Sequence, residues 1–153
     1  RLEDVVHGAI ADNKYLLRKS RVAVMIEGME YRVYTDERWV RFVLNQIISN
    51  AVKYRSGEPA VHFFTEKKGN QVFLNIKDNG IGIPQSDLPR IFEKGFTRQN
   101  GRMLQNSTGI GLYLCRRLCD RLGIGLTARS EERGGTTIIL SFQVNDFVTG
   151  ARG

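Results

Sequence analysis

The chain has few of the residues that mark a disulfide scaffold or a metal centre. It contains two cysteines, Cys115 and Cys119, and two histidines among 153 residues. The cysteines lie four positions apart in one helical pattern, where a disulfide cannot form without distorting the helix. No Cys-x-x-Cys motif or histidine cluster accompanies them, so we interpret both as small buried apolar residues in a reducing compartment.

Long apolar runs are also missing. No run is long enough to cross a bilayer, and the first residues do not have the pattern of a signal peptide. The chain opens without an initiator Met on a segment that already has a helical pattern, so we expect a piece of a longer protein, whose other parts can be anchored in a membrane. The 153 residues are enough for one domain with a single core.

The net charge of +7 does not come with a basic run. Lys and Arg are scattered, without interleaved aromatic residues of the kind that stack on bases, so we expect no nucleic-acid binding. A modest cluster of Lys94, Arg98 and Arg102 suits a polyphosphate better than a duplex. We interpret the remaining positive charge as solvated surface that faces acidic partners or an anionic membrane.

Hydrophobic periodicity predicts helices and strands that alternate unevenly, which is typical of a mixed sheet with helices on one face. We expect helices near residues 2–18, 36–57, 84–92 and 109–122, and strands near 21–27, 31–34, 60–65, 71–77, 125–130 and 136–144. Asp36 is expected to cap the second helix, whose apolar residues from Trp39 to Ala51 point inward. The stretch 92–108 has no clear period and is rich in polar and basic residues, which predicts a flexible functional loop.

Two glycine-rich segments carry the clearest functional signal. The first, residues 78–84, begins with Asp78 at the end of an apolar strand, and its glycines let the backbone approach a ligand closely. The second, residues 107–112, runs into a helical pattern whose free backbone N–H groups attract phosphate. Together they predict a nucleotide site, although Asn79-Gly80 by itself is also a common hairpin turn.

The second predicted helix carries a polar stripe beside its apolar one. Its members, at spacings of three and four, are Gln46, Asn50, Lys53 and Tyr54. Asn50 lies among apolar residues near the helix end, where an amide oxygen can join phosphate and water oxygens around Mg²⁺, while Lys53 supplies a point charge. A solvated helix face is the alternative, and it applies best to Lys53.

In this order, the segments closely resemble the catalytic and ATP-binding domain of bacterial sensor histidine kinases, within the Bergerat-fold ATPase superfamily. The match covers about residues 21–144. It includes an N box at 46–54, glycine boxes at 78–84 and 108–112, an F box at 91–96 and a weaker third glycine box at 134–136. The resemblance implies a two-layer α/β sandwich, with a mixed, mostly antiparallel sheet of about five strands and three main helices on one face.

The resemblance also implies roles for single residues. Asp78 would accept a hydrogen bond from the adenine amine, and Asn50 would contact Mg²⁺. Lys53 and Tyr54 would meet the phosphates or the ribose. Thr136 would help to hold a water beside Asp78.

Further contacts would come from the glycine boxes and from the lid, residues 92–108. By the resemblance, the residues that pack on adenine, anchor the lid or offer backbone N–H groups to phosphate are Gly80, Ile81, Gly82, Ile83, Phe92, Phe96, Thr108, Gly109, Gly111 and Leu112. Arg98 or Arg102 would reach the γ-phosphate from the lid. A mobile solvated loop is the alternative for these two arginines.

The chain departs from the family pattern at three points. Gln46 stands where the N box usually has its first Asn, and Arg133 stands where the third glycine box often has Gly. No phosphoacceptor motif is visible, because neither His7 nor His62 has the expected following residues. We interpret both histidines as structural or surface residues.

The implied function is transfer of the ATP γ-phosphate to a histidine on a separate domain. We expect residues 1–20 to end a helical linker from a missing dimerisation and phosphoacceptor domain, 21–146 to form the catalytic domain, and 147–153 to be a tail. The parent would be a homodimer in a bacterial plasma membrane that signals to a response regulator. This piece would be a cytoplasmic monomer that touches the membrane only through missing segments.

Three other functions remain open. A Bergerat-fold ATPase would need a carboxylate at the position of Gln46 to activate water, and an amide cannot act as a general base. A short serine kinase of the anti-sigma type shares the fold, but the F box argues against it. From a different class, a non-catalytic ATP-sensing or interaction module would not need the full set that includes Asp78 and Asn50.

Overall fold

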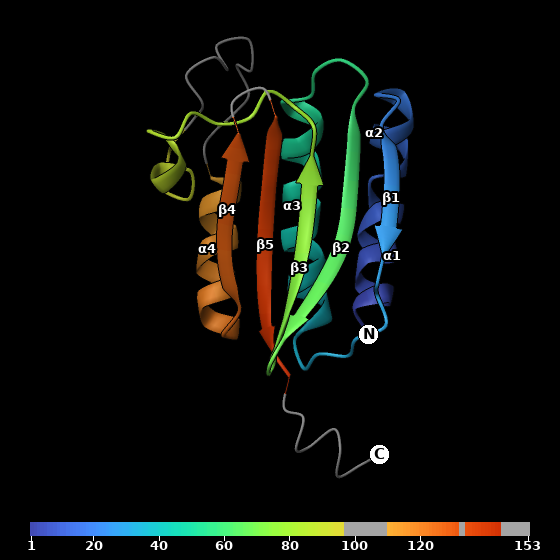
Figure 1. Cartoon of the computed structure of the whole chain (residues 1–153), viewed down its shortest axis with the longest axis vertical. Helices are drawn as coiled ribbons and strands as arrows, with labels where there is room; N and C mark the ends of the chain where they lie inside the picture. The colour runs from blue at the N-terminus through green and yellow to red at the C-terminus, as the bar shows by residue number, and fades with distance from the viewer. Residues whose placement is uncertain (97–109, 132–133, 145–153) are drawn as a thin grey trace.

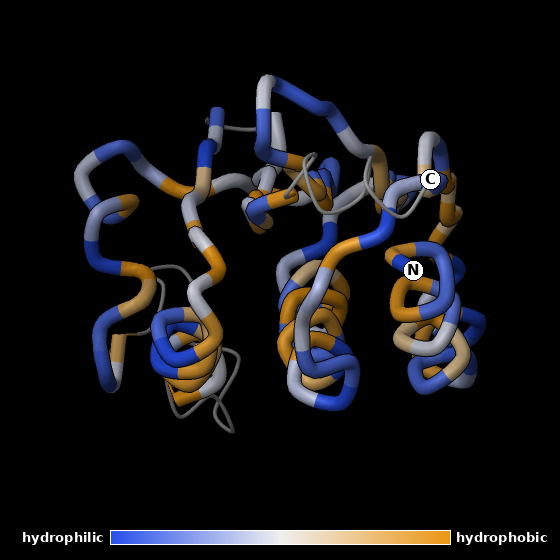
Figure 2. The backbone as a smooth tube through the Cα atoms, turned by 90° about the horizontal axis from the view of Figure 1, so that it is seen from below, coloured by the Kyte–Doolittle hydropathy of each residue, from blue (hydrophilic) through white to orange (hydrophobic). Residues whose placement is uncertain are grey.

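A computed structural model of the chain describes residues 1–96, 110–131 and 134–144. The elements are, in order, α1 (Leu2–Asp12), α2 (Lys14–Lys19), β1 (Ala23–Glu27), α3 (Glu37–Lys53), β2 (Ala60–Lys68), β3 (Gln71–Asp78), the 3₁₀ helix η1 (Leu88–Arg90), α4 (Gly111–Leu122), β4 (Gly125–Glu131) and β5 (Gly135–Gln143). The strands form one five-stranded sheet in the order β1-β2-β3-β5-β4. Helices α1, α3 and α4 lie on one of its faces (Figures 1 and 2). The predicted two-layer sandwich is confirmed.

The sheet is mixed, as predicted. β1 and β2 are parallel, whereas the other neighbours are antiparallel. β2 and β3 form the expected hairpin, in which Gly69 turns the chain with a φ of +58°. The end of β3, which carries Asp78, therefore lies in the middle of the sheet rather than at an edge.

The hydrophobic core fills the space between the sheet and the helices. Residues that alternate along the strands, such as Phe63, Leu74 and Ile76, are buried against Leu44 and Ile48 of α3, as the period of two predicts. Burial of each such side chain stabilises the fold by roughly 1.5–3 kcal/mol.

Both cysteines face this core from α4 and have free thiols, as predicted. Burial raises the pKa of the Cys115 thiol to about 12 and that of Cys119 to about 11. Thiols with such pKa values stay protonated and behave as small apolar groups.

Residues 1–20 contribute apolar side chains to the core. The predicted single helix is two, since the chain breaks at Asn13, whose side-chain amide donates to the Ala9 carbonyl (2.8 Å) and to Asn45 (3.0 Å). Leu2 and Val6 on α1 are fully buried. The buried residues of α1 therefore pack on this domain, whatever segment precedes them in a longer protein.

Three local predictions were wrong. Residues 31–34 form no strand, because the Tyr31 carbonyl accepts a hydrogen bond from the Leu2 N–H instead of pairing with the sheet. Trp39 is 44% exposed, since it lies one position before the stripe that starts at Val40 and packs edge-on against Phe42. The predicted helix at 84–92 is reduced to the three residues of η1.

The capping prediction for α3 is confirmed. The Asp36 carboxylate accepts hydrogen bonds from the N–H groups of Arg38 (3.0 Å) and Trp39 (3.4 Å). Helix α3 then runs to Lys53, slightly short of the expected end. Across the described ranges, none of the helices has the length and apolar character that a bilayer crossing requires.

Candidate functional site

The end of α3 and the first glycine segment meet through their backbones. Ile81 N–H donates to the Tyr54 carbonyl at 3.1 Å. A Cβ on Gly80 would lie 2.5 Å from the same carbonyl oxygen, so only glycine fits there. The last turn of α3, with the half-buried Asn50 and Lys53, therefore lies beside the segment that begins at Asp78.

Asp78 is oriented by hydrogen bonds from two directions. Its Oδ1 accepts from the Gly80 N–H at 2.9 Å, which makes a local turn, and from the Thr136 N–H of β5 at 3.2 Å. Gly135, with a φ of +90°, packs so closely on the Asp78 backbone that a Cβ there would collide with its carbonyl. The fold thus joins two segments of the expected site that are 58 residues apart.

Asn79 supports this turn from the other side. Its side-chain oxygen accepts from the Ala60 N–H at 2.8 Å, and its amide donates to the Glu58 carbonyl at 2.9 Å. The Asn79-Gly80 pair is therefore not a simple hairpin turn, because its side chain fastens β3 to the loop between α3 and β2.

The start of α4 approaches α3 at Gln46. A Cβ on Gly111 would lie 2.6 Å from Gln46 Oε1, at the end of the Gln46 side chain, so the two helices approach closely at this point. Helix α4 begins at Gly111, with Leu112 half-buried, and has no acidic residue in its first turn. Its first N–H groups can therefore receive an anion without repulsion from a carboxylate.

Part of the expected phosphate site lies outside the described residues. The described ranges leave out Arg98, Arg102, Thr108, Gly109 and most of the lid. They also leave out Arg133 and the tail at 147–153, which belong to other predicted segments. The described root of the lid packs on the domain. Ile91 is buried, and the Arg116 guanidinium of α4 lies 4.6 Å from the centre of the Phe92 ring.

Two more contacts between a cation and an aromatic ring lie near the root of the lid. The Arg90 guanidinium lies 5.2 Å from the centre of the Phe96 ring, and the Lys94 ammonium lies 6.0 Å from that of Tyr113 on α4. These contacts hold the F box between η1 and α4. His62 lies on the opposite face of the sheet, where it contacts the Glu27 carboxylate, and His7 is exposed on α1.

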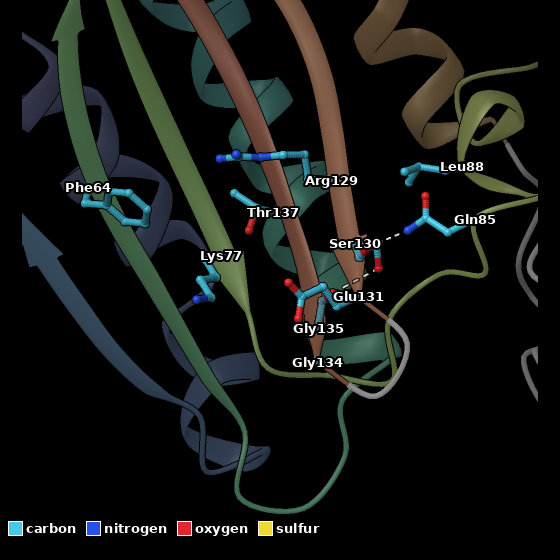
Figure 3. A pocket seen from close by; sticks show the side chains of 10 residues that line it. All are labelled: Phe64, Lys77, Gln85, Leu88, Arg129, Ser130, Glu131, Gly134, Gly135 and Thr137. Carbon is cyan, nitrogen blue, oxygen red and sulfur yellow. Dashed lines mark hydrogen bonds between the residues drawn. The ribbon is translucent and has the colours of Figure 1, made fainter.

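A pocket of about 510 Å³ lies on the sheet face that has no helices. Figure 3 shows the residues that line it, which are Phe64, Lys77, Gln85, Leu88, Arg129, Ser130, Glu131, Gly134, Gly135 and Thr137. Phe64 and Lys77 alternate with the core residues Phe63 and Ile76, so they point away from α3. This pocket is not the expected nucleotide site, but it borders that site at Ser130 and Gly135.

The described residues fit Mg²⁺ when the phosphates of a nucleotide complete its ligand set. Among the described residues, no cluster of His, Cys, Asp and Glu side chains could hold a metal by itself. An amide oxygen such as that of Asn50, combined with phosphate oxygens, is a ligand set that Mg²⁺ accepts. The Asp78 carboxylate, held by the N–H groups of Gly80 and Thr136, is an acceptor that suits the amine of a nucleotide base.

Sequence reasoning assigned no role to Asn79 or to Ser130. Ser130 is a buried serine at a core-facing position of β4, only 6% exposed. That combination, a polar residue where the strand alternation demands an apolar one, is the signal that could have found it.

Comparison with known proteins gives the following matches. Residues 35–146 match the family described as "Histidine kinase-, DNA gyrase B-, and HSP90-like ATPase". The sensor histidine kinase GraS of Staphylococcus haemolyticus is 46% identical over 110 residues, which cover 72% of this chain and 32% of GraS. The sensor histidine kinase YxdK of Bacillus subtilis is 36% identical over 116 residues, which cover 74% and 35%. The chain spans about a third of the length of these curated relatives.

Solved structures share the fold at low identity. The catalytic domain of the histidine kinase ThkA matches with a TM-score of 0.78 at 20% identity, covering 93% of this chain and 91% of the other. The mycobacterial sensor histidine kinase MprB matches with a TM-score of 0.78 at 19% identity, covering 90% and 94%.

Proposed function

Because this chain belongs to the family of histidine kinase-, DNA gyrase B- and HSP90-like ATPases, we propose that it binds Mg²⁺-ATP and transfers the γ-phosphate to a histidine on a separate domain of a longer sensor kinase. The observation that carries this proposal is the meeting of three segments. The turn after Asp78 lies against the end of α3, and α3 in turn touches the start of α4.

The adenine end of the site is formed around Asp78. Its carboxylate, fixed in orientation by the N–H groups of Gly80 and Thr136, accepts from the adenine amine. The base lies against the backbone of this segment, where the Tyr54 carbonyl requires glycine at position 80 and Gly82, with a φ of +77°, continues the turn. The side chains of Ile81 and Ile83 supply apolar contact along the same segment, and the Tyr54 carbonyl holds that segment in place.

The phosphate end is formed by α3 and α4. Asn50 binds Mg²⁺ through its amide oxygen, and Lys53 places a positive charge near the phosphates. The N–H groups at the start of α4, at Gly111 and Leu112, bind phosphate oxygens. Thr108, Gly109 and the lid cations Arg98 and Arg102 complete this end, with Phe92 and Phe96 anchoring the lid. Bound Mg²⁺ would neutralise charge on the transferred phosphoryl group.

The chemistry that these residues perform is positioning rather than water activation. Phosphoryl transfer to an imidazole depends mostly on alignment and charge neutralisation. Hydrolysis needs a base near the γ-phosphate, and Gln46, which faces the start of α4, has an amide that cannot take a proton from water. This supports transfer to a partner domain over rapid ATP hydrolysis.

We also propose the nature of the longer protein to which this domain belongs. Its parent is a homodimeric sensor of the bacterial plasma membrane, with this domain on the cytoplasmic side, and it phosphorylates a response regulator. Among solved structures with this fold, ThkA is recorded in complex with the response regulator TrrA, which supports a partner of the same class here.

The test combines binding and transfer. Calorimetric titration with a non-hydrolysable ATP analogue and Mg²⁺ should show binding by this domain alone. ATP labelled at the γ-phosphate should then label a separately produced helical domain, taken from the upstream part of the parent, on its histidine. Rapid hydrolysis by this domain alone, or the same labelling after that histidine is replaced by Ala, would contradict the proposal.

A further inference from the structure

Ser130 joins three parts of the nucleotide site through one hydroxyl group. Its Oγ accepts from the Ile83 N–H at 2.6 Å and lies 2.9 Å from the Gly135 carbonyl and 3.2 Å from the Thr136 hydroxyl. Its backbone carbonyl accepts from the Gln85 side-chain amide at 2.7 Å (Figure 3). Ser130 therefore fastens the end of the first glycine segment to the start of β5.

The protons and lone pairs of each partner decide which atom donates in each hydrogen bond of Ser130. A serine hydroxyl has one proton and two acceptor lone pairs. The Gly135 carbonyl can only accept, so it takes the Ser130 proton, and the Ile83 N–H can only donate, so it occupies one lone pair. The remaining partner, Thr136, must then donate its own proton to Ser130 Oγ.

This direction has a consequence for the ligand. With its proton committed to Ser130, the Thr136 hydroxyl offers only lone pairs to the nucleotide site. Asp78, which the Thr136 N–H holds at 3.2 Å, is likewise an acceptor. We infer that Ser130 is a positioning residue that keeps Thr136 an acceptor and so makes the site select a purine with a 6-amino group over one with a 6-carbonyl group.

The inference rests on the proposed ATP site, and it deepens that proposal by naming a residue that sets base selectivity. Both hydroxyls are deeply buried, with Ser130 6% and Thr136 2% exposed, so bulk water cannot easily replace a lost bond. Without the Ser130 hydroxyl, the Thr136 proton is free to turn toward the ligand and to satisfy a carbonyl.

The experiment compares Ser130→Ala, Thr136→Val and the double variant in calorimetric titrations with Mg²⁺-ATP and with Mg²⁺-ITP, whose base has a carbonyl in place of the amine. We expect Ser130→Ala to weaken ATP binding about tenfold, because a buried hydrogen bond is lost, and to weaken ITP binding much less. The ratio of ATP to ITP affinity should therefore fall. In the Thr136→Val background, Ser130→Ala should leave the ratio unchanged, because no hydroxyl remains to be oriented.

Two controls separate this role from a structural one. Ser141→Ala removes a serine hydroxyl near the other end of β5 and should leave the ratio as it was. Ser130→Thr keeps the hydroxyl and should preserve the ratio even where the added methyl group lowers thermal stability. If Ser130→Ala weakened ATP and ITP equally, Ser130 would be only structural and the inference would be overturned. If the unmodified domain bound neither nucleotide, it is the proposed function that would fail.

Discussion

In the site that we propose, the orientation of a single carboxylate decides how a base is recognised. Asp78 Oδ1 accepts N–H groups from its own turn and from β5, which fixes the plane of the carboxylate. An amide can preserve those two contacts through its oxygen. What an amide changes is the second atom, because an NH₂ group donates where a carboxylate oxygen accepts.

Asp78→Asn should therefore damage binding more than folding. The new donor would meet the adenine amine, which is also a donor, at a cost of about 1–3 kcal/mol, or roughly tenfold to a hundredfold in affinity. Titration with an ATP analogue measures this effect. The Asp120→Asn variant, with the same change at an exposed position of α4, should bind the ATP analogue with unchanged affinity. Unchanged affinity in Asp78→Asn would remove this carboxylate from the site.

Gly80→Ala tests the close approach of the first glycine segment to α3. The added Cβ would lie 2.5 Å from the backbone oxygen of Tyr54, which cannot move aside as a flexible side chain does. We expect a loss of about 1–3 kcal/mol in stability, seen as a lower melting temperature, together with weaker ATP binding. Gly8→Ala on α1 is the matched control, because its Cβ would meet only the end of the Arg41 side chain. Equal melting temperatures for the two variants would refute the steric argument.

At the scale of elements, the site depends on how α3 and α4 are placed against the sheet. Helix α3 presents an apolar stripe to the core, and the same helix carries Gln46 and Asn50 beside that stripe. The contact between Gln46 and Gly111 brings the start of α4 close to α3, at the end of the site that we propose for the phosphates. In the proposed site, one helix thus supplies side-chain ligands while the other supplies backbone N–H groups.

Asn50→Ala should weaken ATP binding mainly in the presence of Mg²⁺. The side chain is half-buried near the end of α3, so its loss removes an oxygen ligand without opening the core. ATP affinity measured across a Mg²⁺ titration should lose most of its metal dependence. Asn50→Asp retains an oxygen for the metal and should keep that dependence. An Asn50→Ala domain that is as Mg²⁺-dependent as the original would place the metal elsewhere.

At the scale of the whole molecule, an ion pair links the N-terminal helix to α3. Arg41 donates two hydrogen bonds to the Asp12 carboxylate, both at 2.6 Å. Hydrogen bonds from Arg41 and then from Asn45 lower the pKa of Asp12 from 3.8 to about 2. A carboxylate with a lowered pKa stabilises the fold above its unfolded pKa, and that stability is lost as the pH falls through the folded value.

The stability of the domain should therefore drop between about pH 4 and pH 2, partly through Asp12. Asp12→Asn should flatten this part of the curve, with a small effect at pH 7 because the pair is open to solvent. Urea unfolding at a series of pH values measures it. Glu3→Gln, exposed on the same helix, should leave the slope unchanged. An Asp12→Asn curve parallel to the original would show that the pair does not couple folding to pH.

Much of the fold and part of the site followed from local signals. The β2–β3 hairpin, the Asp36 cap and the apolar stripe of α3 each depend on residues close in sequence, and the structure has all three. The ordered glycine segments and the polar stripe at Asn50 also lie within single stretches of the chain. Their chemistry indicated a nucleotide site and the family.

Only the tertiary structure decided which distant segments lie side by side and form hydrogen bonds with one another. Strand order places β5 between β3 and β4, which brings Thr136 to Asp78 and Ser130 to Ile83. The same packing buries apolar side chains of α1 such as Leu2 and Val6, leaves Trp39 exposed and keeps Tyr31 out of the sheet. Periodicity reports what each segment can bury, whereas hydrogen bonds between strands depend on which segments become neighbours, and that is settled when the whole core packs.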